Sequence, residues 1–594
     1  MNEKIKAKAL PDAASLTIDP KHYYRQDVVG YYEFPCPMED GTMRSAKLYL
    51  AENSIYTQPT VFLLPPSGTD AWEFLEESGW KDLAEKENLY LVVLEPENGA
   101  WKADETEYIG TMVKYINTRP FFAAFASKFY GAAYGDGADC LGLYSRRYAK
   151  SFAGVALLGT TGMSQEEKTF LETTDSPVKG IRLSQIQMPV WAVAAEETAA
   201  VSRMLEYYRK ADHSQEKAEK TAWADRVYRP DPAGSGSLDE DWCADVIFSV
   251  GNWKDCVSEE FSETLYRHLF KGTGRYTGNA NGALRHDGDM KERGFRFFSE
   301  MVPGGFREDQ TDLYERQWWV YVPDTVEPGK KVPAVFMFHG AGGFGIEIGD
   351  RSGWARVAEK HGFILICPCA SHDNKVRKAG HMTLSNIHRT RWNSGGPTES
   401  VPGELEFMDW LYRWVLDHYP VDETRVYASG QSSGGMMAWA CACYRPDYFA
   451  AAAPFSATTP DIMAKEMVPP VEGSPIAVMA NMGLADKIFE GGFSTDSARK
   501  LVEYWSRRYR LDHDWSDFQF GGDGRTATFK DGKFNNYVFR TADGVPMLRC
   551  VETETKTHAV LPSECEMAWT QFFTKFTKDV KSGVLYYKGR PVEV

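Results

Sequence analysis

The C-terminal half of the chain contains a serine in a setting suited to nucleophilic attack on a carbonyl carbon. Residues 430–434 read Gly-Gln-Ser-Ser-Gly, after a strand-like segment at 425–428 and before a helix-like run at 436–444. A tight strand-to-helix turn exposes the serine hydroxyl, and the helix N-terminus directs free N–H groups at a developing oxyanion. Glycines on both sides leave room where a Cβ would clash. The spacing predicts that Ser432 is a nucleophile; the alternative is a glycine-rich turn that contains serine by chance.

A second segment is a glycine-rich loop at residues 339–343, His-Gly-Ala-Gly-Gly, directly after the apolar run 334–338. Such a loop brings a backbone N–H to the oxyanion from the side opposite the serine turn. The alternative is a phosphate-binding loop, but no Lys-Ser or Lys-Thr pair follows, as a P-loop requires. We therefore interpret the loop as half of an oxyanion hole.

A carboxylate and a base follow the serine in the chain order that this chemistry uses. Asp486 lies in the loop that leaves an apolar strand, although a plain turn aspartate would look the same. Of the two later histidines, His513 lies in a charged stretch. His558 lies between a strand-like segment at 551–557 and a helix-like segment at 564–573. We predict that Asp486 orients His558 and that His558 takes the serine proton.

The elements that must position these residues occur twice in the chain. Residues 61–86 align without a gap to residues 335–360, with ten of 26 positions identical, and residues 129–154 align to 426–451. Each copy reads as a short apolar strand, a glycine-bearing loop, a helix and a further strand. Strands that alternate with helices predict an α/β fold with mainly parallel sheets flanked by helices.

Chain length supports two domains, because 594 residues exceed what one ordinary core contains. From the repeated plan we predict one α/β domain at residues 1–285 and a second at residues 286–594. Residues 271–289 are rich in Gly and Asn and lack apolar periodicity, so we predict the linker there.

From about residue 316 to residue 575 the chain resembles the polyhydroxybutyrate-depolymerase and feruloyl-esterase group of α/β-hydrolases, carbohydrate esterase family one and its relatives. The resemblance rests on the HGAGG loop, the GQSSGGMMA run, Arg-Trp-Asn at 391–393 and Gly-Leu-Ala-Asp at 483–486. It implies tandem α/β-hydrolase-like domains, the second of which hydrolyses a hydroxyalkanoate, feruloyl or similar aromatic or short acyl ester through an acyl-enzyme. One departure is the histidine turn, which reads Lys-Thr-His-Ala-Val where the family usually has a Gly-rich turn and Trp-Pro.

The resemblance also implies roles for individual residues. The catalytic triad would be Ser432, Asp486 and His558. The oxyanion hole would use the backbone N–H groups of Ser433 and of Gly340 or Ala341. The residues expected near the substrate are His339, Trp392, Asn393 and Gln431.

The first copy lacks this machinery in the same alignment. Gly135 faces the predicted nucleophile, and Pro-Pro-Ser-Gly-Thr at 65–69 faces the HGAGG loop. Glu196-Glu197 could retain a carboxylate, but residues 248–254 offer no histidine. Without hydroxyl and base there is no acyl transfer, so we predict a catalytically inactive domain. The sequence leaves three roles open for this domain: it could cover the active site, form an oligomer contact or bind part of the substrate.

Composition excludes several classes of function. The net charge of −16 argues against a nucleic-acid partner, because phosphate binding needs clustered cations. We expect no membrane span, since no run of about 18 apolar residues occurs. We also predict no cofactor. The scattered histidines lack metal-ligand spacing, so no metal site is predicted. The ten cysteines form no CxxC pair, and the N-terminus has no signal-peptide pattern. From these two features we predict a cytoplasmic location.

Two alternatives to an esterase remain. A serine peptidase could use the same fold, although its usual propeller would show a strand repeat of about 40–50 residues, and none occurs here. A non-catalytic binding protein is the other, and the three intact triad candidates argue against it. The expected partner is a small-molecule or oligomeric ester substrate, and homo-oligomer formation is left open.

Overall fold

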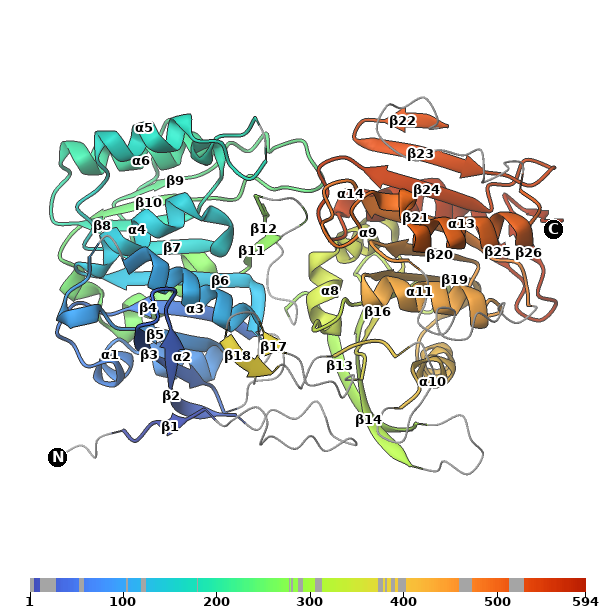
Figure 1. The fold of residues 1–594 in the computed structure, drawn as a ribbon, viewed down its shortest axis with the longest axis horizontal. Helices are drawn as coiled ribbons and strands as arrows, with labels where there is room; N and C mark the ends of the chain where they lie inside the picture. Colours follow the sequence, from blue (N-terminus) through green and yellow to red (C-terminus); the bar gives the residue numbers. More distant parts are fainter. Residues whose placement is uncertain are drawn as a thin grey trace. The chain divides into compact units, whose positions relative to one another are not determined.

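A computed structural model of the chain describes residues 5–10, 28–52, 58–102, 105–118, 124–178, 180–276, 278, 281–286, 292–304, 312–371, 378–379, 382–385, 390–393, 402–458, 473–511 and 528–593. The chain forms two compact units, one built mainly from residues 25–289 and one mainly from residues 290–594. Each unit contains a ten-stranded sheet flanked by helices (Figure 1).

The sheet of the second unit carries the predicted site. Its central strands are parallel, and antiparallel strands form both edges. In spatial order the strands are β13 (Arg296–Pro303), β14 (Leu313–Tyr321), β16 (Ile364–Pro368), β15 (Val332–Phe338), β19 (Val421–Gln431), β20 (Ala451–Phe455), β21 (Ala477–Gly483), β24 (Leu548–Thr553), β23 (Phe534–Phe539) and β22 (Phe529–Asp531). β15 and β16 are apolar and buried throughout, as strands covered on both faces must be.

Helices connect and cover these strands. They are α8 (Gly345–Arg351), α9 (Trp354–His361), α10 (Glu404–His418), α11 (Ser433–Tyr444), α13 (Asp496–Arg508) and α14 (Pro562–Met567). Ten of the twelve residues of α11 are buried, because this helix packs against the centre of the sheet. Parallel strands place their carboxyl ends at one edge, so the loops after β15, β19, β21 and β24 converge there.

The first unit repeats this order. Its strands, in spatial order, are β1 (Lys8–Ala9), β2 (Gly30–Pro37), β3 (Met43–Leu50), β5 (Tyr90–Leu94), β4 (Gln58–Leu64), β6 (Ala124–Tyr134), β7 (Gly154–Leu158), β8 (Val190–Ala194), β10 (Val246–Val250) and β9 (Arg226–Tyr228). β4 lies between β5 and β6 just as β15 lies between β16 and β19. The predicted α/β class, with mainly parallel sheets and flanking helices, is confirmed.

The helices of the first unit follow the same plan. They are α1 (Ala71–Glu77), α2 (Trp80–Glu87), α3 (Thr106–Thr118), α4 (Gly137–Arg147), α5 (Gln165–Thr173), α6 (Ala199–Ala211) and α7 (Glu259–Leu265). The two gapless sequence alignments therefore each cover a strand and the helices after it, in both units.

The predicted linker at residues 271–289 is wrong over part of its length. Residues 273–276 and 283–286 form the antiparallel strands β11 (Thr273–Tyr276) and β12 (Ala283–His286). The Arg275 guanidinium is buried and donates hydrogen bonds to the carbonyls of Phe152, Gln187 and Gly282. A buried cation that is paired in this way looks like a surface residue in the sequence, so the pattern could not reveal the hairpin.

Three further predictions from composition concern the cysteines, metal sites and membrane spans. All ten cysteines are thiols, and nine are buried. Over the residues that the structure describes, no cluster of His, Cys, Asp and Glu side chains could hold a metal ion. Within the same residues, no helix has the length and apolar character needed to cross a membrane.

Candidate active site

Ser432 lies at the turn between β19 and α11, at the carboxyl edge of the second sheet. Its backbone has φ 56° and ψ −120°, a combination that a residue with a Cβ rarely adopts. The Ser432 N–H donates to the carbonyl of Phe455, at 3.0 Å, which ties the turn to the end of β20. The strained backbone turns the half-buried side chain out of the sheet at the start of a helix.

The two glycines of the turn are required by close backbone contacts. A Cβ on Gly434 would lie 2.1 Å from the carbonyl oxygen of Phe338, at the end of β15. A Cβ on Gly430 would lie 2.1 Å from the carbonyl oxygen of Gly434. Real Cβ atoms do not approach oxygen so closely, so α11 can pack against β15 only with glycine at these positions.

We expect Gly434→Ala to lower the stability of the second unit by about 2 kcal/mol or more, because backbone must shift to admit the methyl group. The thermal unfolding midpoint of the full chain measures this change. Gly251→Ala is the matched control, since its nearest neighbour would be a Val193 methyl at 4.0 Å. Equal midpoints for both variants would show that the contact at Gly434 is not a constraint.

The HGAGG loop follows β15 and lies beside the serine turn. The N–H of Gly342 donates to Thr390 O at 2.7 Å, and the N–H of Gly343 donates to Gly340 O at 3.0 Å. Among the described residues, the N–H groups of Gly340 and Ala341 donate no backbone hydrogen bond. A Cβ on Gly340 would lie 3.5 Å from the Ser432 Cβ, so this part of the loop adjoins the nucleophile candidate.

His339 and Trp392 support the loop from behind. The His339 ring is buried, its Nδ1 lies 2.7 Å from Gly340 O, and its Nε2 lies 2.9 Å from the N–H of Ala370. These partners describe a neutral ring with the hydrogen on Nδ1. The indole of Trp392 is 1% exposed and donates to His339 O at 2.8 Å. Both side chains were predicted near the substrate; their burial gives them a supporting position beneath the oxyanion loop.

Asp486 and His558 are brought together from segments 72 residues apart. His558 Nδ1 lies 2.8 Å from Asp486 Oδ2, with the carboxylate buried and the imidazole 21% exposed. The N–H groups of Ile488 and Phe489 donate to Asp486 Oδ1, at 2.8 and 3.3 Å. Burial raises the pKa of Asp486, but these donors and His558 outweigh it, so the pKa falls below its ordinary value. A buried carboxylate that stays ionised is suited to orient an imidazole.

Two side chains, one from the serine turn and one from the residue after β20, donate hydrogen bonds to backbone carbonyls of the histidine turn. The Gln431 amide donates to the carbonyl of His558 at 3.3 Å, and the Ser456 hydroxyl donates to the carbonyl of Ala559 at 3.0 Å. Gln431 was predicted to contact the substrate, and this bond gives it a positioning role as well. No hydrogen bond joins Ser432 Oγ to His558 in the part of the chain that the structure describes; such bonds are often long before substrate binds.

A buried ion pair below the histidine turn was not predicted. Lys556 Nζ lies 2.8 and 3.1 Å from the two carboxylate oxygens of Glu564, and both side chains are fully buried. Glu564 also accepts from the Thr553 hydroxyl at 2.6 Å and the N–H of Leu561 at 3.0 Å. The carbonyl of Lys556 accepts from the N–H of Ala485, beside Asp486. Glu564 thus joins the two ends of the turn that presents His558.

We expect Lys556→Met to destabilise the second unit by about 3–5 kcal/mol, because it leaves the Glu564 carboxylate buried without a counterion. The double variant Lys556→Met/Glu564→Gln should recover more than half of this loss. Urea unfolding of the full chain measures both effects. A single variant as stable as the wild type would show that the pair does not hold the turn.

The other predicted residues lie as follows. Ser433 is the first residue of α11, where the N–H has no acceptor within the helix, and its hydroxyl accepts from the N–H of Trp392 at 3.2 Å. Asn393 is half-buried beside Trp392. His513, the rejected base, lies outside the described residues. Only the tertiary structure reveals Glu564 and Lys556, because charged residues in a polar stretch carry no sequence signal of burial.

The chain is similar to known esterases over part of its length. A family model described as a putative esterase matches residues 314–487. A probable acetylxylan esterase A from Aspergillus clavatus is 28% identical over 138 residues, which are 23% of this chain and 40% of that protein. Feruloyl esterase B from Thermothelomyces thermophilus is 31% identical over 154 residues, 25% of this chain and 46% of that protein. The chain spans about two fifths of the length of the curated relatives that it matches.

Among solved structures, the acetyl xylan esterase from Aspergillus awamori matches with a TM-score of 0.33 and 16% identity, over 47% of this chain and 99% of that one. The matched residues 314–487 include the HGAGG loop, the serine turn and Asp486. The family model and the curated relatives support the feruloyl-esterase side of the resemblance, and the matched part of the second unit is similar to acetylxylan and feruloyl esterases.

Proposed function

We propose that the second unit is a serine carboxylic ester hydrolase. The observation that supports this most is the strained Ser432 backbone, at φ 56° between β19 and α11. A strand-to-helix turn keeps this strain only where the surrounding packing enforces it, and such sites are commonly functional. The bonded pair of Asp486 and His558 supplies the orienter and base that the serine needs.

In the proposed mechanism, His558 Nε2 removes the proton of Ser432 as Oγ attacks the ester carbonyl carbon. Asp486 holds the hydrogen on Nδ1 and stabilises the imidazolium that forms. The N–H groups of Ser433 and of Gly340 or Ala341 stabilise the tetrahedral oxyanion. The imidazolium then protonates the leaving alkoxide, and an acyl-enzyme remains. Water, activated by His558, releases the acid and restores Ser432.

For the substrate, we propose a short or aromatic acyl ester of a carbohydrate. The support comes from the relatives, whose names include acetylxylan esterase and feruloyl esterase. A hydroxyalkanoate ester, as in polyhydroxybutyrate, stays a prediction from the sequence. The buried Trp392 does not offer an open ring face to an acyl group, so discrimination between acetyl and feruloyl groups must rest on other side chains.

Initial rates on p-nitrophenyl acetate, p-nitrophenyl butyrate and methyl ferulate test the reaction and the acyl group together. We expect turnover of at least one ester and a clear preference among the three. Absence of turnover, together with resistance to a fluorophosphonate that acylates active serines, would overturn the proposal. Cleavage of a peptide amide with no ester turnover would favour the serine-peptidase alternative.

We also propose that the first unit carries no acyl-transfer activity. Gly135, the counterpart of Ser432, keeps the turn with φ 61°, and its N–H donates to Leu158 O at 2.8 Å. The indole of Trp253 lies beside it, since a Cβ on Gly135 would be 3.3 Å from that ring. Trp253 follows β10 where His558 follows β24. An indole thus follows the strand where a base would be expected, and the residue at the nucleophile position is a glycine, which has no hydroxyl.

A further inference from the structure

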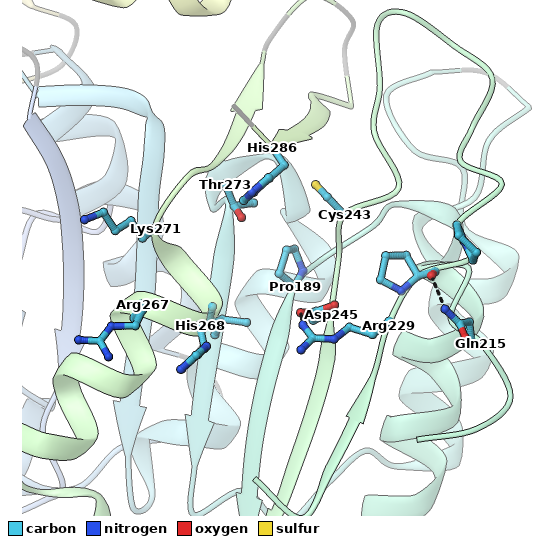
Figure 2. Close-up of a pocket in the computed structure, with 13 residues that line it drawn as sticks. Pro189, Gln215, Arg229, Cys243, Asp245, Arg267, His268, Lys271, Thr273 and His286 are labelled. Carbon is cyan, nitrogen blue, oxygen red and sulfur yellow. Dashed lines mark hydrogen bonds and ion pairs between the residues drawn. The ribbon is translucent and has the colours of Figure 1, made fainter. Parts of the chain in front are cut away.

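The first unit contains a cavity of about 530 Å³ that does not indicate a ligand (Figure 2). Arg229 in its wall pairs with Asp245 and Glu219. Lys271, also in the wall, pairs with Glu87. Most of the positive charge of the cavity is therefore neutralised within the protein. Beside the proposed esterase centre, by contrast, apolar side chains are exposed where a substrate must lie.

This apolar surface lies in the loop that follows β21. Ile488 is 66% exposed, and it is the most exposed large apolar side chain among the described residues. Phe489 is partly exposed, and its ring centre lies 5.6 Å from the centre of the His558 imidazole, with the planes at 41°. The residues on either side of this pair, Lys487 and Glu490, are exposed and charged. The Ile488–Phe489 surface is therefore two side chains wide.

Hydrogen bonds hold the backbone of this surface in place. The N–H groups of Ile488 and Phe489 both donate to Asp486 Oδ1, at 2.8 and 3.3 Å. The carbonyl of Phe489 accepts from the N–H of Gly492 at 2.9 Å. One carboxylate thus orients His558 and also fixes the aromatic residue beside it. A surface that is already ordered loses little conformational entropy when a substrate packs on it.

The arrangement of groups around the reacting carbon decides which part of a substrate reaches this surface. In the proposed tetrahedral intermediate, that carbon carries Ser432 Oγ, the oxyanion, the leaving oxygen and the acyl group. The oxyanion faces the backbone donors of the HGAGG loop and of α11. The leaving oxygen must lie within hydrogen-bonding distance of His558 Nε2, because the imidazolium protonates it. The leaving alcohol is thus the part of the ester that lies nearest a side chain packed beside the imidazole.

We propose that Ile488 and Phe489 form the subsite for the leaving alcohol, and that this subsite favours an alcohol that carries a ring over a small alcohol such as methanol. This inference rests on the proposed esterase function. The Phe489 ring would pack against the ring of the alcohol, and Ile488 would extend the contact. Two apolar side chains between charged neighbours match one ring in width, and they offer little apolar surface to a long alkyl chain.

Benzyl acetate and methyl acetate test the proposal on the full chain, because both esters give the same acetyl-enzyme and release alcohols of similar acidity. Deacylation is then identical, so a difference in kcat/KM reports how the alcohol is bound. We expect the wild type to prefer benzyl acetate. Phe489→Ala should lower the ratio of the two kcat/KM values about five- to tenfold, and Ile488→Ala about two- to threefold. Because the ratio compares two esters of one variant, an effect of the substitution on His558 itself cancels.

Phe489→Tyr and Phe297→Ala are the matched controls. Tyrosine keeps a ring beside His558, so the ratio should return to near its wild-type value. Phe297 is 41% exposed on β13, at the far edge of the same sheet, so its loss should not change the ratio. A ratio as low in either control as in Phe489→Ala would overturn the assignment of the ring to the alcohol.

A second pair of esters, methyl acetate and methyl ferulate, shares methanol and differs in the acyl group. We expect Phe489→Ala to change this acyl ratio much less than the alcohol ratio. A fall in the acyl ratio with an unchanged alcohol ratio would place Phe489 in the acyl subsite and refute the proposal. If the wild type turns over none of these esters, the esterase function fails and this subsite with it. Turnover with an unchanged alcohol ratio in Phe489→Ala would overturn the subsite alone.

Discussion

Replacement of Ser432 by alanine should lower kcat for ester hydrolysis by about 10⁵–10⁶-fold. Without Oγ no acyl-enzyme forms, and His558 and the oxyanion donors can stabilise only a slow attack by water. The fold should persist, because the Ser432 N–H bond to Phe455 O belongs to the backbone. The φ of 56° is somewhat unfavourable for alanine, as it is for serine, so stability changes little.

The measurement compares kcat and fluorophosphonate labelling of the wild type, Ser432→Ala and Ser67→Ala. Ser67 is the matched control, since it lies in the loop of the first unit that aligns with HGAGG, and its hydroxyl bonds to Asp136. We expect one labelled serine per chain in the wild type and in Ser67→Ala, and none in Ser432→Ala. Turnover that survives in Ser432→Ala would place the nucleophile elsewhere and would refute the proposed mechanism.

Asp486→Asn should lower kcat by about 10⁴-fold while leaving substrate binding almost unchanged. The amide has nearly the shape of the carboxylate, but an N–H that faces His558 Nδ1 forces the hydrogen onto Nε2. The imidazole then cannot accept the proton of Ser432, and the charge that stabilises the imidazolium is lost. The effect should therefore fall on kcat, not on KM.

Steady-state kinetics of Asp486→Asn and of Asp417→Asn separate this effect from a general loss of charge. Asp417 is exposed on α10, so its neutralisation should leave kcat within about twofold. An Asp486→Asn enzyme with more than a tenth of wild-type kcat would mean that Asp486 does not orient the base, and another carboxylate would have to be sought.

The lowered pKa of Asp486 also predicts a pH-dependent stability difference. A group whose folded pKa is depressed stabilises the fold above its unfolded pKa of about 3.9, and this contribution is lost as pH falls through the folded value. The unfolding midpoint of the wild type should therefore exceed that of Asp486→Asn at pH 7, and the gap should close below about pH 4. A gap that is constant from pH 7 to pH 3 would contradict the lowered pKa.

Much of the second unit's site follows from local sequence. The serine turn needs a strand, two glycines and a helix within 24 residues. Each of these features has a recognisable sequence pattern in residues 421–444. The HGAGG loop is equally local, because it follows an apolar strand directly. The order of residues along the chain then predicts that Asp486 and His558 are partners. In the structure, His558 Nδ1 lies 2.8 Å from Asp486 Oδ2.

The same reasoning was weaker for side chains whose partners are distant. Trp392 looks like an exposed loop aromatic in the sequence, yet its indole is buried and donates to His339 O, 53 residues away. Lys556 and Glu564 read as surface charges, but they form a buried pair. Burial is decided by the packing of several elements at once, and a polar residue type does not report it.

For this protein, the sequence by itself determined the α/β class, the two copies of the plan and the types of residue available for acyl transfer. Periodic apolar segments and glycine-bearing turns are local features, so they can be recognised in the sequence without knowledge of the tertiary structure. The tertiary structure alone decided what Arg275 does, because a guanidinium bonded to three carbonyls from distant segments turns a predicted linker into a packed hairpin.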